Sequence, residues 1–429
     1  MALIQELHPT SKATHVASAA YTLGKKVDEA AKKTPSEYIS KQRDAVVSAT
    51  HKVTASLFRP SGPPFSPTPL AMQLGSKDLS LVSWAVSILV LFDARAMSAE
   101  VPKLYSVLAE RALQPKVMEA NEKEVYAWAQ LLLGVAKVGD RSSVVAEDKR
   151  VKELFTFAIE RRLPFLLTNT GKVCVPQDIS NVALACVYIG YTGNMAPFVS
   201  AVAHKISAKD GTADFAPQNW SNLIYACGKL VDLAGGEVSV LGKDVGVIVR
   251  ESAVAMRRAA SPAAPIKPKA QELSDTLWGL AHFERCDAGV ISVLAEGFVQ
   301  GIKSSTPQGV ANVLLALAKL SWYDDSVVSK LADAAVERVS SSDPQALSNN
   351  LLSLSNLGWY DRVVYDALVA GLVKCPEQPV PQALSNAIYG CAMASHSGAA
   401  VDALASMVSK QDLSGWENQH VTKSVCMGC

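Results

Sequence analysis

The stretch PQALSNNLLSLSNLGWY at residues 344–360 decides the fold, because it recurs along the chain. Residues 307–323 read PQGVANVLLALAKLSWY and residues 381–394 read PQALSNAIYGCAMA, so Pro307, Pro344 and Pro381 are spaced by 37 residues. Proline is tolerated in the first turn of a helix, the apolar residues that follow recur at helical spacing, and Gly358 is expected to end the helix. A period of 37 residues leaves room for a second helix and two turns.

Looser copies of the motif continue upstream. They read AQELSDTLWGLAHF at 270–283, PQNWSNLIYACGKL at 217–230, PQDISNVALACVYIG at 176–190, WAQLLLGVAKVG at 128–139 and LVSWAVSILVLF at 81–92. When the copies are aligned on the asparagine of the motif, that column is position 0 and holds Leu81, Gln130, Asn181, Asn222, Asp275, Asn312, Asn349 and Asn386. The sequence therefore predicts an all-α fold, an α-solenoid of about eight tandem antiparallel helix-pair repeats, in which helix A carries the motif and helix B follows it.

Two further columns of helix A predict buried positions. Position +4 holds only small residues, which allow neighbouring helices to approach closely: Ala85, Gly134, Ala185, Ala226, Gly279, Ala316, Ser353 and Gly390. Position +5 holds Val86, Val135, Cys186, Cys227, Leu280, Leu317, Leu354 and Cys391. Three cysteines thus replace Val or Leu, and we expect them to be buried, reduced thiols.

The repeats occupy residues 77–429, and residues 1–76 form a poorly defined N-terminal region with a proline-rich linker. The stretch 11–57 is rich in Ala, Ser, Thr and Lys, which is typical of organelle targeting segments, whereas its acidic residues, Asp28 and Glu29 among them, count against that interpretation. Residues 413–429 resemble the beginning of a further unit, so we expect the last unit to be truncated.

Composition narrows the classes of function. Of 429 residues, 49% are apolar and 19% are charged, and the net charge is +1. This composition provides a large core and excludes wholesale disorder. The apolar run at 81–92 is shorter than the about 20 residues that a membrane-spanning helix needs, so no membrane partner is expected. The global charge does not indicate a polyanionic partner, and any contact with one must depend on local features.

No pattern for catalysis or metal binding is present. The histidines are scattered, and the chain has no GxSxG, HExxH or glycine-rich phosphate-binding loop. The one metal-like spacing, Cys426 and Cys429 with His420 nearby, provides too few paired ligands for a zinc site. We therefore predict that the protein is not an enzyme and has no cofactor, no metal site and no small-molecule substrate.

The motif PQALSNxLxxLxxLG, followed by a second helix, resembles the octotricopeptide repeat family and the related FAST-kinase-like, leucine-rich helical repeat proteins of organelles. The resemblance extends over residues 77–429 and is strongest in the three 37-residue units. It implies sequence-selective binding of single-stranded organelle RNA, in RNA processing, stability, splicing or translation, alone or with other proteins of an RNA-processing complex. The chloroplast is the favoured location and the mitochondrion is the alternative. Nothing in the chain resembles the RAP domain with which some relatives end.

Residues that vary between repeats are the better candidates for reading bases. Lysines could contact phosphates and rings could stack on bases at position +7, which holds Lys137, Tyr188, Lys229, His282, Lys319 and Asn356. Position −3, expected to be exposed and equally variable, holds Asp178, Asn219 and Glu272. Both positions share one helix face with positions 0 and +4. An ordinary solvated helix face explains this pattern equally well.

The recurring asparagines at position 0 are Asn181, Asn222, Asn312, Asn349 and Asn386. Their amides could bind base edges. A residue that recurs unchanged cannot discriminate between bases, so a structural role within or between repeats is favoured. The alternative to RNA binding is a protein-binding scaffold of the armadillo or HEAT type without nucleic-acid binding, which the near-neutral charge favours slightly.

Overall fold

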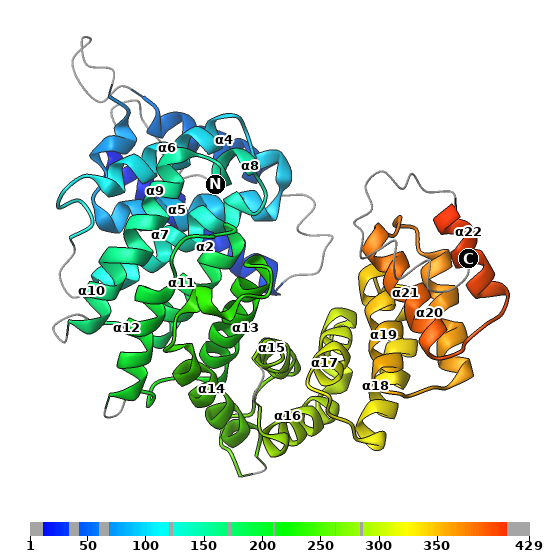
Figure 1. Ribbon diagram of the computed structural model, residues 1–429. Coiled ribbons are helices and arrows are strands. Elements are labelled where there is room, and N and C mark those ends of the chain that lie inside the picture. The colour runs from blue at the N-terminus through cyan, green and yellow to red at the C-terminus, as the bar shows by residue number, and fades with distance from the viewer. Residues whose placement is uncertain are drawn as a thin grey trace. The chain divides into compact units, whose positions relative to one another are not determined.

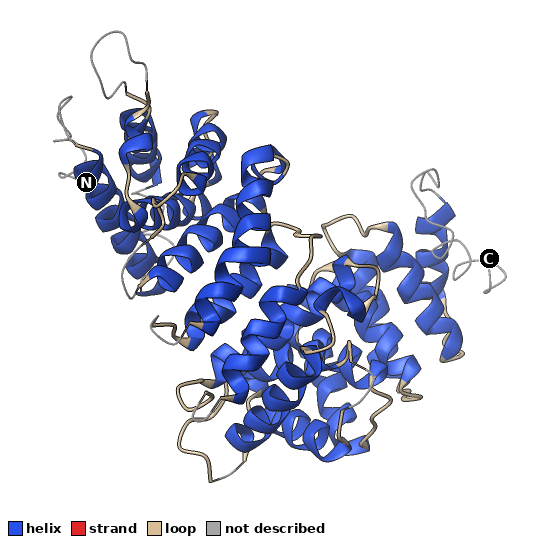
Figure 2. Ribbon diagram, turned by 60° about the vertical axis from the view of Figure 1, so that its left-hand side comes forward, coloured by secondary structure: helices blue, strands red, loops and turns tan. Residues whose placement is uncertain are grey.

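The computed structural model describes residues 12–33, 43–59, 68–119, 123–169, 173–208, 211–261, 263–283 and 286–409. Helices and loops make up this part of the chain, and none of it forms a strand (Figure 2). The protein is an all-α solenoid of tandem helix pairs, which confirms the fold predicted from the 37-residue period. The truncated last unit and the pair Cys426 and Cys429 lie outside the described residues.

Each copy of the motif forms helix A of a pair. These helices are α5 (Ser76–Phe92), α7 (Glu124–Gly139), α11 (Pro176–Tyr188), α13 (Pro217–Leu233), α15 (Ala270–Leu280), α17 (Pro307–Lys319), α19 (Pro344–Asn356) and α21 (Pro381–Met393). Where the motif begins with proline, that proline is the first helical residue, because its missing N–H has no intrahelical partner to lose there.

Helix B follows each helix A. These helices are α6 (Glu100–Leu113), α12 (Ala196–Ser207), α14 (Val245–Ala260), α16 (Ala288–Gln300), α18 (Asp325–Glu337), α20 (Arg362–Lys374) and α22 (Ala399–Ser409). After α7, helix B is divided into α8 (Ser143–Ala146), α9 (Lys149–Phe157), a π-helical turn (Ala158–Arg162) and α10 (Leu163–Thr168).

The chain divides into two compact units. Unit 1 comprises Met1–Asn219 and Lys229–Ile248, and unit 2 comprises Trp220–Gly228 and Val249–Cys429. In unit 1, α5 packs on α7 and α7 packs on α11 (Figure 1). In unit 2, α15 packs on α17, α17 on α19, and α19 on α21, while the B helices α16, α18 and α20 pack on one another in the same order. Helices A and helices B therefore form separate layers within each unit.

A further helix pair precedes the copies of the motif. It consists of α2 (Ala13–Lys33), which packs on α5, and α4 (Arg43–Leu57), which packs on α6. The helical packing thus begins upstream of residue 77, where the sequence carries no recognisable motif.

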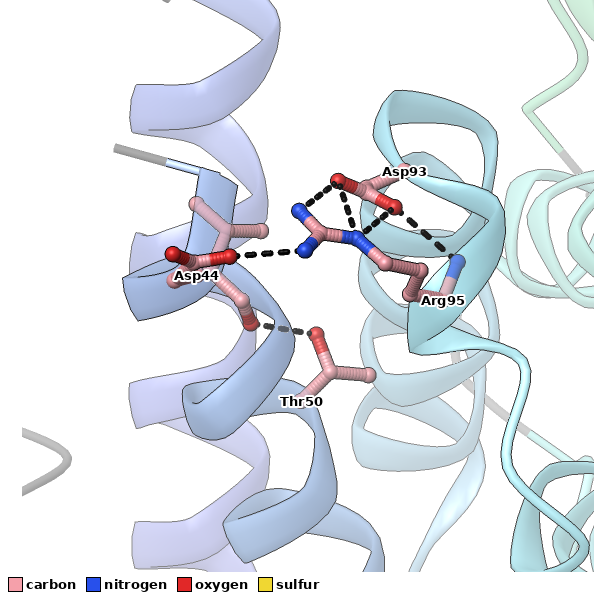
Figure 3. A network of polar contacts seen from close by, with 5 residues as sticks. Asp44, Thr50, Asp93 and Arg95 are labelled. Atoms are coloured by element: carbon pink, nitrogen blue, oxygen red, sulfur yellow. Dashed lines mark hydrogen bonds and ion pairs between the residues drawn. The ribbon is translucent and has the colours of Figure 1, made fainter. Parts of the chain in front are cut away.

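Ion pairs of one arginine join α4 to the turn that follows α5. The guanidinium of Arg95 lies 2.7 Å from Asp44 Oδ1 and 2.8 Å from Asp93 Oδ2 (Figure 3). The hydrogen bonds from Arg95 lower the pKa of Asp93 to about 2. Thr50, also drawn in Figure 3, donates its hydroxyl to the carbonyl of Val46 within α4. The added helix pair is therefore held to the array by charge as well as by apolar packing.

Successive helices A cross with their backbones in contact. A Cβ atom added to Gly279 would lie 2.6 Å from the carbonyl oxygen of Ile224, and one added to Gly390 would lie 2.8 Å from that of Leu351. In unit 1, a Cβ on Gly134 would lie 2.7 Å from the carbonyl oxygen of Ser83. Each of these contacts joins position +4 of one helix A to position +2 of the preceding one. The small residues predicted at position +4 are thus required by the spacing of the helices.

Position +5 lies in the core throughout, as predicted. Cys186, Cys227 and Cys391 are at most 3% exposed and form no disulfide. Burial raises the pKa of the Cys227 and Cys391 thiols to about 12. These thiols are therefore protonated, apolar core groups at neutral pH.

Four helices A end in the same left-handed turn. Position +9 holds Gly190, Ser321, Gly358 and Ser395, with φ angles of 67°, 51°, 70° and 52°. The next residue donates its N–H to the carbonyl of position +5, as Trp359 does to Leu354 over 3.0 Å. The prediction that Gly358 ends helix A is confirmed. Glycine adopts a positive φ without steric cost, whereas serine is strained there.

Replacing Ser321 by glycine should therefore stabilise the fold. We expect Ser321→Gly to raise the free energy of unfolding by about 0.5–1 kcal/mol, because the strain removed exceeds the extra entropy of glycine in the unfolded chain. The reciprocal change, Gly358→Ser, should lower it by a similar amount. Urea unfolding followed by circular dichroism measures both. A Ser321→Gly variant less stable than the parent would contradict this account of the turn.

Candidate functional site

Helix A begins with a hydrogen-bonded pair between the glutamine of the motif and position 0. The glutamine amide donates to the side chain four residues later over 2.8–2.9 Å, in the pairs Gln177–Asn181, Gln271–Asp275, Gln308–Asn312 and Gln345–Asn349. Residues four apart lie on one face of a helix, so this pair is a local feature of the motif.

Position 0 also links neighbouring repeats. In unit 2, Asn386 Nδ2 lies 3.5 Å from Asn349 Oδ1, and these residues are 4% and 8% exposed. In unit 1 the neighbouring positions make such a link, since Asn219 at position −3 donates from Nδ2 to Oε1 of Gln177 at position −4 over 3.1 Å. Asn222 is half-buried in α13. These contacts favour a structural role for the recurring asparagines, because the Oδ1 atoms of Asn181, Asn312 and Asn349 are already engaged within the repeat.

Position −3 is not the exposed position expected from the sequence. Asp178 and Asn219 are only 4% and 6% exposed, and Glu272 is half-buried. Asp178 accepts a hydrogen bond from the N–H of Val175 over 3.2 Å, and Asn219 and Glu272 accept the equivalent bonds in α13 and α15. The N–H groups at the start of a helix lack intrahelical partners, and a polar side chain in the third helical position satisfies one of them.

In two later repeats the capping hydrogen bond runs the other way, from the backbone N–H of position −3 to the side chain of the residue before the helix. Position −3 is Gly309 in α17 and Ala346 in α19, neither of which can accept a hydrogen bond through its side chain. There the preceding Thr306 and Asp343 accept from the N–H groups of Gly309 and Ala346, over 3.1 and 2.7 Å. In these five repeats the residue at position −3 therefore agrees with the type of cap.

Position +7 lies in the last turn of helix A or directly after it, and it is accessible in both units. Lys319 and Asn356 are exposed, Tyr188 is 38% exposed, and Lys137, Lys229 and His282 are half-buried. Of the candidates from the sequence, this position alone combines variety between repeats with access to solvent.

Two of these residues come from consecutive repeats and are in contact. Lys319 Nζ lies 3.2 Å from His282 Nε2, while His282 Nδ1 lies 2.9 Å from the carbonyl oxygen of Trp278. A carbonyl only accepts, so Nδ1 carries the proton and Nε2 accepts from the lysine. The imidazole also lies against the Trp278 ring, with centroids 4.2 Å apart. The arrangement sets a cation beside two rings in contact, whose planes are tilted by 46°.

Lys137 is less accessible to solvent than Lys319. Burial lowers the pKa of its ammonium group, and the carboxylate of Asp28 on α2 acts in the opposite direction. Lys319 is thus the more accessible cation at position +7.

A hollow in unit 1 was not foreseen from the sequence. It has a volume of about 680 Å³ and is lined by residues of α2, α5, α7 and the beginning of α11. Lys77 and Tyr126 line it from position −4, where the later copies have glutamine. The absence of glutamine at position −4 in these two copies was the feature of the sequence that could have indicated the hollow.

The described residues contain no group of three His, Cys, Asp or Glu side chains that could hold a metal ion. In the same part of the chain, no helix is both long and apolar enough to cross a bilayer.

Asp275 stands where most repeats have asparagine, and burial raises the pKa of its carboxyl to about 6. Because this pKa lies above that of an unfolded aspartate, the group favours folding in its protonated form. That contribution is complete below about pH 4 and is lost as the pH rises through about 6.

Asp275→Asn should therefore stabilise the protein at neutral pH and not in acid. We expect a gain of about 1–3 kcal/mol in the free energy of unfolding at pH 7.5 that shrinks towards zero near pH 4. Denaturant unfolding at a series of pH values measures it, with Asp333→Asn, an exposed carboxylate on α18, as the matched control. A gain that does not change with pH would contradict the assignment of the effect to the raised pKa of Asp275.

Neither protein-family models nor curated proteins give a match to this chain. Among solved structures, the chain is similar to a "circular tandem repeat protein with novel repeat topology and enhanced subunit contact surfaces". The sequence identity is 11%, the alignment covers 97% of each chain, and the TM-score is 0.25. The assignment of the fold rests on the helix packing described above.

Proposed function

We propose that this helical repeat protein binds single-stranded RNA with sequence selectivity. It would act without catalysis in the processing, stability, splicing or translation of organelle RNA, with the chloroplast favoured. The proposal rests on the resemblance of the repeat motif to the octotricopeptide family and on the row of accessible, varied side chains at position +7. One such side chain per repeat suits a modular reader of about one base per repeat.

The contact between His282 and Lys319 is the single observation that supports this proposal most directly. The 3.2 Å between Nζ and Nε2 means that position +7 of one repeat reaches position +7 of the next. An extended strand lying along α15 and α17 would therefore meet these side chains in sequence. Lys319 would contact a phosphate, and the half-buried ring of His282 would offer a surface for stacking.

The alternative is a protein-binding scaffold. The net charge of +1 and the 48%-exposed Met393 at position +7 of α21 favour it, since RNA-binding surfaces are usually basic. The two functions differ in salt dependence, because phosphate contacts release counterions and contacts with a neutral protein surface do not.

The test is binding of the full chain to random pools of single-stranded RNA at two salt concentrations. Each phosphate contact contributes about −0.7 to the log–log salt slope, so three lysines predict a slope of about −2. Changing Lys137, Lys229 and Lys319 together to alanine should weaken binding and flatten the slope.

The matched control replaces three exposed lysines outside position +7, namely Lys243, Lys303 and Lys330, and changes the net charge equally. If this control weakens binding as much as the position +7 variant does, the contacts are not specific to that position. If no pool binds more tightly than about 10 μM, the protein-scaffold function replaces RNA binding.

A further inference from the structure

The hollow in unit 1 lies where helices A depart from the regular repeat motif. Its lining includes Tyr21, Lys77, Lys123, Tyr126, Val175 and Asp178. Its volume of about 680 Å³ lies within the range of small-molecule sites in proteins.

The repeat motif changes at this place. Lys77 and Tyr126 occupy position −4, where α11, α15, α17 and α19 have the glutamine that pairs with position 0. Position 0 is Leu81 in α5 and Gln130 in α7. The structural hydrogen bond of the later repeats is thus replaced by a cation, a phenol ring and an open space.

Asp178 is the buried carboxylate of the hollow, and the buried Ser80, which also lines it, donates its hydroxyl to the carbonyl of Lys77. Asp178 is 4% exposed, and one carboxylate oxygen accepts from the N–H of Val175 over 3.2 Å. Its other oxygen has no hydrogen-bond partner among the described residues. Burial raises the pKa of this carboxyl to about 6, so most of it is ionised at neutral pH, with the N–H of Val175 as its one hydrogen-bond donor among the described residues. A buried carboxylate of this kind favours a ligand that supplies N–H groups.

The remaining walls include two tyrosines and two lysines among serine and aliphatic side chains. Tyr126 is 39% exposed, and the half-buried Tyr21 packs on Trp84 with ring centroids 5.4 Å apart. Lys77 and Lys123 are exposed, and no hydrogen bond or ion pair engages their ammonium groups in the described part of the chain. The hollow therefore offers a carboxylate, ring surfaces for stacking and two cations at its edge.

These groups discriminate between two kinds of ligand. Aromatic rings with a carboxylate would also suit a guanidinium or ammonium ion, but two lysines oppose a cationic ligand. A planar ligand that carries adjacent N–H donors and a negative group matches the carboxylate, the tyrosine rings and the two lysines. Guanine has such an edge, with N1–H and the N2 amino group side by side, and its phosphate is anionic.

We propose that this hollow binds a guanine nucleotide, with the base between Tyr21 and Tyr126, its N1–H and N2 amino group on Asp178, and its phosphate near Lys77 and Lys123. The nucleotide is either free or part of an RNA strand, and the recognition chemistry is the same. The inference does not depend on RNA binding at position +7, because the hollow is lined by other residues.

The test is calorimetric titration of the full chain with GMP, IMP and AMP at about pH 8, where Asp178 is ionised. IMP keeps N1–H and lacks the N2 amino group, whereas AMP has neither donor. A two-donor contact is worth a factor of about 5–150. We expect GMP to bind at least about tenfold more tightly than AMP, with IMP between them.

Asp178→Asn tests the carboxylate without removing the helix cap, since Asn219 performs the same cap in α13. This variant should bind GMP no better than AMP. Glu272→Gln changes the equivalent capping carboxylate of α15, outside the hollow, and should leave GMP binding unchanged. Tyr126→Phe should retain binding and Tyr126→Ala should weaken it about tenfold, because stacking needs the ring and not the hydroxyl.

Two RNA strands distinguish a free nucleotide from a base within RNA. One is a heptanucleotide of adenines, and the other is the same strand with one central guanine. A preference for the guanine strand that Asp178→Asn abolishes identifies a base within RNA. Binding of GMP without such a preference identifies a free nucleotide, and both results support the proposal. Equal affinity for GMP and AMP, GMP binding that Asp178→Asn leaves intact, or no binding at millimolar GMP would overturn it.

Discussion

The contact on which the rest of the structure depends is the crossing of successive helices A at position +4. Gly134, Gly279 and Gly390 lie so close to the backbone of the preceding helix that a single added methyl group would overlap it. Protein interiors are close-packed, so a residue that keeps two backbones in contact determines the spacing of the whole layer. The other columns take their environments from this spacing: position +5 lies in the core and position +7 reaches solvent.

This spacing also decides which side chains can act together. In unit 2 it brings His282 of α15 within 3.2 Å of Lys319 of α17, and Asn386 of α21 within 3.5 Å of Asn349 of α19. Equivalent positions in adjacent repeats are therefore neighbours, as a modular binding surface requires. Position 0, which is buried at Asn349 and Asn386 and half-buried in the other repeats, contributes to the scaffold, and position +7 is accessible to solvent.

The sequence predicted much of the fold and less of the site. Each helix A could be placed because its motif is local and repeats, and the small residues at position +4 and the cysteines at +5 follow from helical spacing alone. The helix pair α2 and α4 was not recognised because it is held by apolar packing and by Arg95, neither of which leaves a repeated motif. Position −3 was expected to be exposed, but Asp178 and Asn219 are buried, because each caps the start of its helix. The hollow was missed because its walls come from four helices far apart in the chain, and spacing within one helix cannot show such contacts.

The stability of two glycine variants in unit 2 tests the central claim most directly. Gly279→Ala changes position +4 of α15, where a Cβ would lie 2.6 Å from the Ile224 carbonyl oxygen, whereas Gly297→Ala changes a glycine of α16 whose nearest neighbour would lie at 3.4 Å. Alanine favours helix over glycine by about 1 kcal/mol, so Gly297→Ala should raise the free energy of unfolding. Gly279→Ala should lower it by about 1–3 kcal/mol, because two helices must move apart. If both variants are stabilised equally, the close crossing does not determine the spacing of the repeats.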